Sequence, residues 1–146
     1  MISAVVLLGA SLPASAASMD GVSDIKVTVV SACYGDFDLD SYTDDAYVLV
    51  RFNINNPMIV AYNTFYYWIT FMLPSGTTYV YLIYVRAWAN TVEINHVFYN
   101  HVTEPGYYTV NVIAYLTWPG IAYNTATYMF DPPGGSDGGE PTFGVF

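Results

Sequence analysis

Residues Tyr47–Ile54 read Tyr-Val-Leu-Val-Arg-Phe-Asn-Ile, a pattern that indicates the fold class. Its even-numbered positions are all apolar, whereas Arg51 and Asn53 stand between them. Side chains of a β-strand alternate between its two faces, so this period of two predicts a strand with one face in a core and one face toward solvent. A helix would instead repeat its apolar positions every three to four residues.

The same period recurs on both sides of this stretch. Segments rich in β-branched and aromatic residues are separated by turn sequences such as Asn55-Asn56-Pro57 and Pro74-Ser75-Gly76. The predicted strands are 23–33, 47–54, 62–73, 77–87, 91–98, 107–117 and 124–130. No segment combines helix caps with a helical period. We therefore predict an all-β domain over residues 18–131, a single β-sandwich of about seven strands.

The segment Gly106-Tyr107-Tyr108-Thr109-Val110 is more specific. A turn glycine followed two residues later by a tyrosine at a strand start resembles the tyrosine corner of immunoglobulin-like and fibronectin-like sandwiches. The resemblance implies an immunoglobulin-like sandwich in which the Tyr108 hydroxyl bonds to the backbone just upstream. The inter-sheet cysteine pair of antibody domains is absent, because Cys33 is the single cysteine. We expect Cys33 to be a small buried residue of its strand.

Composition limits the class of protein. The 146 residues suffice for one domain, and three Lys+Arg against twelve Asp+Glu give a net charge of −9. Lys26, Arg51 and Arg86 cannot form a basic patch, which excludes a nucleic-acid partner. Charged residues make up 10% of the chain, against about 25% in ordinary domains, and aromatic residues make up 18%. Either neighbouring molecules bury much of such a surface, or the protein lives where ordinary solubility is not the constraint.

The ends of the chain carry separate signals. Residues 1–17 contain an apolar run, Ala4–Ala10, and a small-residue element, Ala14-Ser15-Ala16, typical of a secretory signal peptide. The alternative is a retained apolar N-terminal arm. Both interpretations place the protein outside the cytoplasm, and the run is too short for a stable membrane span. Residues 132–146 form a Pro/Gly-rich tail with an apolar tip, either a frayed end or a segment that docks on another subunit.

The stretch from Asp36 to Asp45 is the strongest candidate site, with five of the twelve acidic residues in ten positions. Carboxylates at loop positions one, three, five and nine and a backbone carbonyl at position seven suit Ca²⁺. The predicted ligands are Asp36, Asp38, Asp40, the Tyr42 carbonyl and Asp44, with Asp45 assisting. The pattern resembles calcium loops of EF-hand and dockerin-like modules and of secreted prokaryotic and archaeal β-rich proteins. It departs from them at position six, Ser41, and position twelve, Tyr47. The alternative is a solvated acidic turn.

No catalytic motif is present, and we expect no enzymatic activity. The spacing of His96 and His101 is not that of a zinc site. Glycoside hydrolysis needs a pair of carboxylates, and the spacing of Glu93 and Glu104 does not place these two together. We interpret His96 as a packed strand residue and His101 as a loop residue.

Two functions fit these observations. In overall plan the chain resembles small secreted archaeal filament and thread subunits built from immunoglobulin-like domains. That resemblance implies a calcium-stabilised structural subunit at the cell surface whose partners are copies of itself, joined when a terminal segment completes a neighbour's sheet. The alternative is a secreted calcium-dependent carbohydrate-binding module with a platform of Trp68, Trp88 and Trp118.

Overall fold

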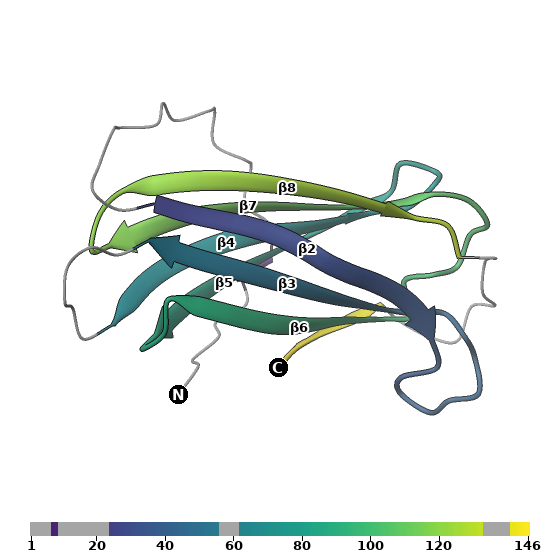
Figure 1. Cartoon of the computed structure of the whole chain (residues 1–146). Coiled ribbons are helices and arrows are strands. Elements are labelled where there is room, and N and C mark those ends of the chain that lie inside the picture. Colours follow the sequence, from purple (N-terminus) through teal and green to yellow (C-terminus); the bar gives the residue numbers. More distant parts are fainter. Residues whose placement is uncertain (1–6, 9–23, 56–61, 133–140) are drawn as a thin grey trace.

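The computed structural model describes residues 7–8, 24–55, 62–132 and 141–146. The strands are β1 (Leu7–Leu8), β2 (Asp24–Gly35), β3 (Asp45–Asn55), β4 (Asn63–Met72), β5 (Thr78–Ala87), β6 (Thr91–Tyr99), β7 (Tyr108–Trp118), β8 (Ala122–Phe130) and β9 (Thr142–Val145). They form two antiparallel sheets, ordered β1-β5-β4-β7-β8 and β2-β3-β6-β9, which lie face to face (Figure 1). The predicted β-sandwich is confirmed. Among the described residues, no helix is long and apolar enough to cross a membrane.

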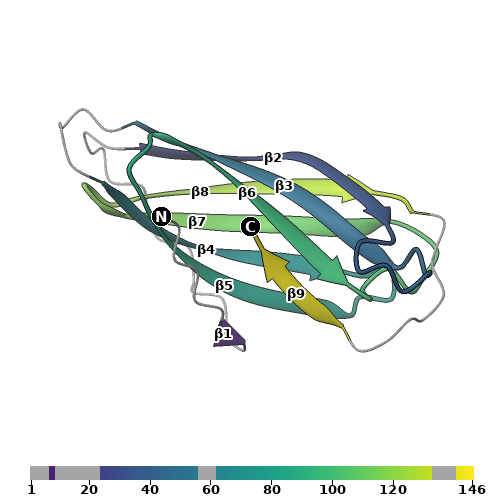
Figure 2. The same cartoon turned by 90° about the horizontal axis from the view of Figure 1, so that it is seen from below.

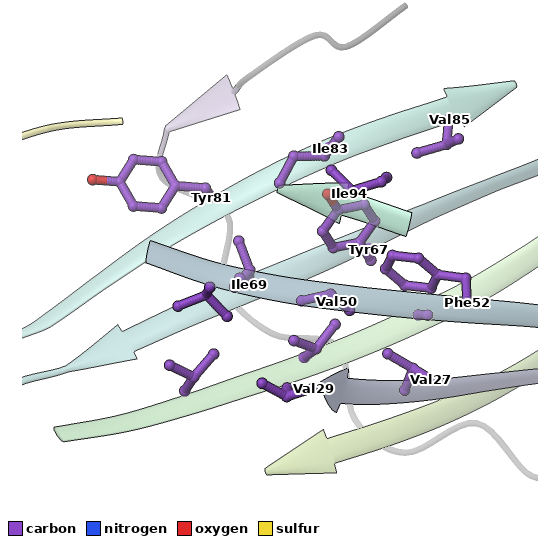
Figure 3. Close-up of a cluster of buried hydrophobic side chains, with 14 of the residues drawn as sticks. Val27, Val29, Val50, Phe52, Tyr67, Ile69, Tyr81, Ile83, Val85 and Ile94 are labelled. Carbon is purple, nitrogen blue, oxygen red and sulfur yellow. The ribbon is translucent and has the colours of Figure 1, made fainter. Parts of the chain in front are cut away.

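Alternation along each strand builds the core between the sheets. In β3, Val48, Val50 and Phe52 are fully buried while Asn53 is exposed, as the period of two predicts. Figure 3 shows Val50 and Phe52 beside side chains of the facing sheet, such as Tyr67 of β4. The Phe52 ring lies 4.7 Å from the Tyr67 ring, centroid to centroid. Burying such large side chains contributes about 1.5–3 kcal/mol each before ordering costs.

All seven predicted strands are present, and two short strands add to them. β9 lies within the tail predicted for residues 132–146 and pairs with β6. β1 lies within the N-terminal segment predicted for residues 1–17 and pairs with β5, and the rest of that segment is outside the described residues. In constant-type immunoglobulin domains, the fourth strand along the chain pairs with the fifth strand, at the edge of the first sheet. Counted from β2, the fourth strand here is β5, and it pairs with β4 in the other sheet. β9 occupies the place beside β6 instead.

A bulge in β2 corrects the expectation for Cys33. Ile25, Val27 and Val29 face the core, but the register with β3 shifts between Val29 and Ser31. One extra residue in one strand reverses the alternation beyond it. Ala32 therefore packs against the core, whereas Cys33 is exposed instead of buried.

The tyrosine corner is confirmed. Tyr108 is fully buried at the start of β7. Its hydroxyl donates to the Glu104 carbonyl at 2.7 Å and accepts from the Glu104 backbone N–H at 2.8 Å. Gly106 in the same turn has φ of +122°, and a Cβ there would meet the Pro74 side chain at 3.2 Å. Glycine suits this position because it alone adopts that backbone conformation without strain.

Candidate functional site

The acidic loop joins β2 to β3 at one end of the sandwich, at the lower right of Figure 1. Within it Asp36, Asp38 and Asp40 come together, so that one carboxylate oxygen of each lies within 4.8 Å of the others. Three hard oxygen ligands at this spacing can hold a divalent cation such as Ca²⁺. The structure thus brings together three of the predicted ligands.

The same carboxylates organise the loop backbone. Asp36 accepts hydrogen bonds from the backbone N–H groups of Asp40 and Ser41, both at 3.1 Å. Asp40 accepts one from the Tyr42 N–H at 2.8 Å. The pKa of Asp38 is raised because partial desolvation and the nearby carboxylates of Asp45, Asp40 and Asp36 disfavour its charged form. The arrangement therefore concentrates negative charge at one point of the surface.

Ser41 stands where calcium loops of this type carry glycine, and its backbone explains the preference. Its φ is +80°, and Leu39 has φ of +66°. Residues other than glycine rarely adopt this left-handed region, because Cβ approaches the backbone closely. The loop therefore makes the sharp turn of a glycine position with a serine.

Asp44 and Asp45 are placed differently from the first three carboxylates. Both are fully buried. The Asp45 carboxylate accepts the N–H groups of Phe37 at 2.7 Å, Asp38 at 3.1 Å and Asn100 at 2.8 Å. It therefore fastens the start of the loop to the connection after β6. Of the remaining predicted ligands, the Asp44 carbonyl accepts from the Val102 N–H at 2.6 Å, and Tyr42 is 43% exposed.

The side of the sandwich formed by β5 and β6 is a second candidate site, which the sequence did not single out. β9 pairs with β6, and β1 pairs with β5 (Figure 2). Tyr81 of β5 is next to both short strands. Its backbone pairs with Leu8 of β1, and its ring stacks on Phe143 of β9 with 4.0 Å between the ring centroids. The sequence signal for β9 is a short alternation, in which the apolar residues Phe143 and Val145 follow Thr142 and Gly144. Four residues are too few to establish a period.

Two buried histidines lie beneath this side. The Tyr67 hydroxyl and His96 Nε2 are 2.6 Å apart, and His96 Nδ1 is 3.1 Å from the Val48 carbonyl oxygen. His101 repeats the arrangement with the Tyr81 hydroxyl at 2.9 Å and the Tyr99 carbonyl at 2.7 Å. A carbonyl oxygen only accepts, so in both rings Nδ1 donates and Nε2 accepts from the tyrosine.

Burial sets the protonation states of these pairs. It lowers the pKa of His96 to about 4 and that of His101 to about 4. It also raises the pKa of Tyr81 to about 12 and that of Tyr67 well above its usual range. All four groups are neutral at pH 7, and their hydrogen bonds satisfy both histidine rings. His96 is thus confirmed as a packed strand residue. His101 lies in the loop after β6, as predicted, but it is also buried and hydrogen-bonded like a core residue.

The three tryptophans do not form one platform. Trp68 is buried on the outer face of β4 against Tyr66 and Tyr115, with ring centroids 5.1 and 5.5 Å away. Trp88 is 71% exposed in the turn after β5, and Trp118, 47% exposed, ends β7. These two lie at the end of the sandwich opposite the acidic loop. The length of β3 separates the two ends, about 35 Å at the usual rise of a strand.

A shallow hollow of about 260 Å³ lies between the end of β2 and the end of β8. Cys33 and Tyr34 line it from one side, and Phe130, Asp131 and Pro132 from the other. Its volume is below that of most small-molecule sites.

Comparisons with protein-family models, with curated proteins and with solved structures found no match to this chain.

Proposed function

We propose that this protein is a structural subunit of an extracellular filament or surface coat. Copies of the chain join through β-strand complementation by a terminal segment, Ca²⁺ stabilises each subunit, and no enzymatic activity is involved. The observation that carries the proposal is that the edges of β5 and β6, on one side of the sandwich, each accept a short strand from an end of the chain. Such an edge offers a neighbour's segment the same main-chain hydrogen bonds.

The distribution of charge supports contact between copies. β4, β5, β7 and β8 contain no Asp or Glu, although the chain carries a net charge of −9. On the outer face of their sheet, paired positions place four tyrosines in a row across the strands: Tyr84, Tyr66, Tyr115 and Tyr123. Arg86 of β5 lies on the same face, so the face has no carboxylates and one positive charge in these four strands. An aromatic face without carboxylates lets acidic subunits approach one another there with little repulsion.

Assembly is tested on the full chain by sedimentation and negative-stain imaging, with Ca²⁺ and with EDTA. We expect uniform filaments or sheets in Ca²⁺ and less sedimenting material in EDTA. Monodisperse single chains at all concentrations, with and without Ca²⁺, would contradict the proposal.

The calcium part of the proposal assigns Asp36, Asp38, Asp40, the Tyr42 carbonyl and Asp44 as ligands, with Asp45 assisting by holding the loop. Binding to the folded state alone stabilises it by about 2.7 kcal/mol when Ca²⁺ exceeds its Kd a hundredfold. We therefore expect the thermal midpoint to rise on adding Ca²⁺ and to fall again with EDTA. Asp38→Asn is expected to abolish that response, whereas Glu93→Gln, on β6, is expected to keep it. An unchanged midpoint in the unsubstituted chain would remove the site from the proposal.

One observation favours the alternative carbohydrate-binding function, namely the exposure of Trp88, whose ring lies 6.0 Å from that of Tyr62. The Arg86 guanidinium in turn lies 3.7 Å from the centre of the Tyr62 ring. However, the acidic loop is at the other end of the sandwich, so Ca²⁺ bound there would not shape this surface. Retardation of the chain on polysaccharide gels, lost in Trp88→Ala and dependent on Ca²⁺, would favour the binding module.

A further inference from the structure

We infer that β9 is an exchangeable strand, and that in assembled material the β9 of one chain occupies the β6 edge of another. This inference rests on the proposed function and deepens it, because it names the donor segment, the acceptor edge and the partner, a second copy of this chain. Three features of the described residues carry it: the open place beside β6, the side chains with which β9 fills it, and the length of chain that leads to β9.

The acceptor edge exists because β5 belongs to the other sheet. β6 pairs with β3 on one side, and on its other side the described residues supply only β9. The pairing extends from Tyr99 opposite Thr142 to His96 opposite Val145. It ends with two reciprocal hydrogen bonds between Asn95 and Phe146, at 3.0 and 2.9 Å. These bonds are made by the main chain and are the same whichever copy supplies the strand.

Side chains fix the register of β9. The Phe143 ring stacks on Tyr81 with 10° between the ring planes, and it lies 5.0 Å from the Phe98 ring and 5.9 Å from the His96 ring. Phe143 and Val145 both pack against the core. A shift of β9 by one residue would turn both side chains outward, so the edge selects one alignment.

The path of the chain allows both arrangements. β8 lies on the opposite side of the sandwich from β6 (Figure 1). There the Asn124 side chain of β8 accepts a hydrogen bond from the Val27 N–H of β2 at 3.1 Å. Eleven residues separate Phe130 from Thr142, and they include four glycines. A chain of that length spans at most about 36–40 Å, whereas three strand spacings amount to about 14 Å. The connection therefore reaches its own β6 with length to spare, and the same length reaches a neighbour.

Exchange conserves the contacts of the subunit. Every strand from β2 to β8 has a partner other than β9, so release of β9 leaves the rest of both sheets paired. Passing an identical element between copies is a low-cost route to association, and in a head-to-tail arrangement it continues without closing. Chain concentration then decides between the internal and the exchanged state.

The test uses two full-length variants in a Cys33→Ser background, one carrying Tyr99→Cys on β6 and the other Thr142→Cys on β9. Directly paired residues of antiparallel strands have Cα atoms about 4.5–5.5 Å apart, which suits a disulfide. Neither variant holds both cysteines, so a disulfide between positions 99 and 142 must join two chains. After co-assembly and mild oxidation, we expect a species of twice the chain mass on a non-reducing gel. We expect at least a tenfold excess over a control in which Thr127→Cys, on β8, replaces Thr142→Cys.

A third variant with Tyr99→Cys and Thr142→Cys in one chain separates the possible failures. The double variant could form filaments in which the 99–142 disulfide lies only within single chains, while the mixture of single variants gives no cross-link. That result would overturn the exchange and leave the filament proposal standing. Cross-links in the mixture without filaments would support the exchange and contradict the filament proposal. The absence of every 99–142 disulfide, in a variant that unfolds cooperatively, would show that β9 does not occupy the β6 edge and would overturn the inference.

Discussion

The Tyr108 hydroxyl makes two hydrogen bonds to the backbone of Glu104, one as donor and one as acceptor. Removing the hydroxyl leaves a backbone N–H and a carbonyl without their partner in a part-buried place. We expect Tyr108→Phe to lower the free energy of unfolding by about 1–3 kcal/mol, measured by urea titration. The neighbouring Tyr107 is 63% exposed, so Tyr107→Phe is the matched control and should change it by less than about 0.5 kcal/mol. Equal effects of the two substitutions would contradict the structural role of this corner.

His96 and His101 make the fold sensitive to mild acid. In the unfolded chain both titrate near pH 6.5, whereas burial holds the pKa of each at about 4 in the folded state. The unfolded state therefore binds more protons between pH 6.5 and 4. The free energy of unfolding is unaffected by these groups above pH 6.5. Below that pH it falls by up to about 1.4 kcal/mol per pH unit for each histidine, until the loss levels off near pH 4.

The fall in the free energy of unfolding with pH is measured by urea unfolding in EDTA at pH 7.0, 6.0 and 5.0. His96→Gln keeps a neutral side chain with a donor and an acceptor, and we expect it to reduce the slope by about half. A slope equal to that of the unsubstituted chain would mean that His96 is not buried in its neutral form.

Single residues also mark where sequence reasoning succeeds and where it ends. Tyr108 was predicted from a local signal, a glycine and a tyrosine at fixed spacing before a strand. Cys33 is expected to be buried because a single thiol in a strand is usually a small core residue, and continuing the alternation of β2 past Val29 would also turn it inward. The bulge that reverses it leaves no mark in the residues themselves, since Val30 and Ser31 are ordinary strand residues. Such a shift depends on the register with β3, which is a tertiary property.

At the scale of elements, the acidic loop combines two kinds of carboxylate that the sequence does not distinguish. Asp45 accepts three backbone N–H groups in a buried place, whereas Asp38 is exposed beside Asp36 and Asp40. We expect Asp45→Asn to lower the free energy of unfolding in EDTA by about 1.5–3 kcal/mol, because an amide N–H would face backbone donors. Asp38→Asn should leave stability in EDTA within about 0.5 kcal/mol and act on the Ca²⁺ response alone. Equal losses from both substitutions in EDTA would show that the loop has no such division.

The strands themselves differ in how far the sequence predicts them. β3 and β7 are long and alternate strictly, so their faces follow from the period of two. β9 has four residues after a segment rich in glycine, and only its pairing with β6 and the ring of Tyr81 give it a place. The cluster of Asp36, Asp38 and Asp40 followed from local spacing, whereas the burial of Asp44 and Asp45 required knowledge of the connection after β6.

At the scale of the whole molecule, a net charge of −9 opposes the approach of copies. Screening of charge shortens that repulsion to about 8 Å at physiological ionic strength and to about 3 Å at 1 M salt. We therefore expect sedimenting material in EDTA to increase between 20 mM and 500 mM NaCl, since aromatic and main-chain contacts are not weakened by salt. Light scattering against salt concentration measures this. A decrease with salt would indicate that ion pairs, and not aromatic and main-chain contacts, join the copies.

The bulge in β2 gives the molecule one chemically addressable point. Cys33 is the single cysteine and faces solvent, and β2 and β9 are the two outermost strands of the same sheet. A maleimide dye would thus attach at one defined position without any engineered substitution, and at the edge farthest from the terminal strands. Energy transfer between dyes on adjacent subunits would then measure the repeat distance of an assembly in solution and follow its growth in real time.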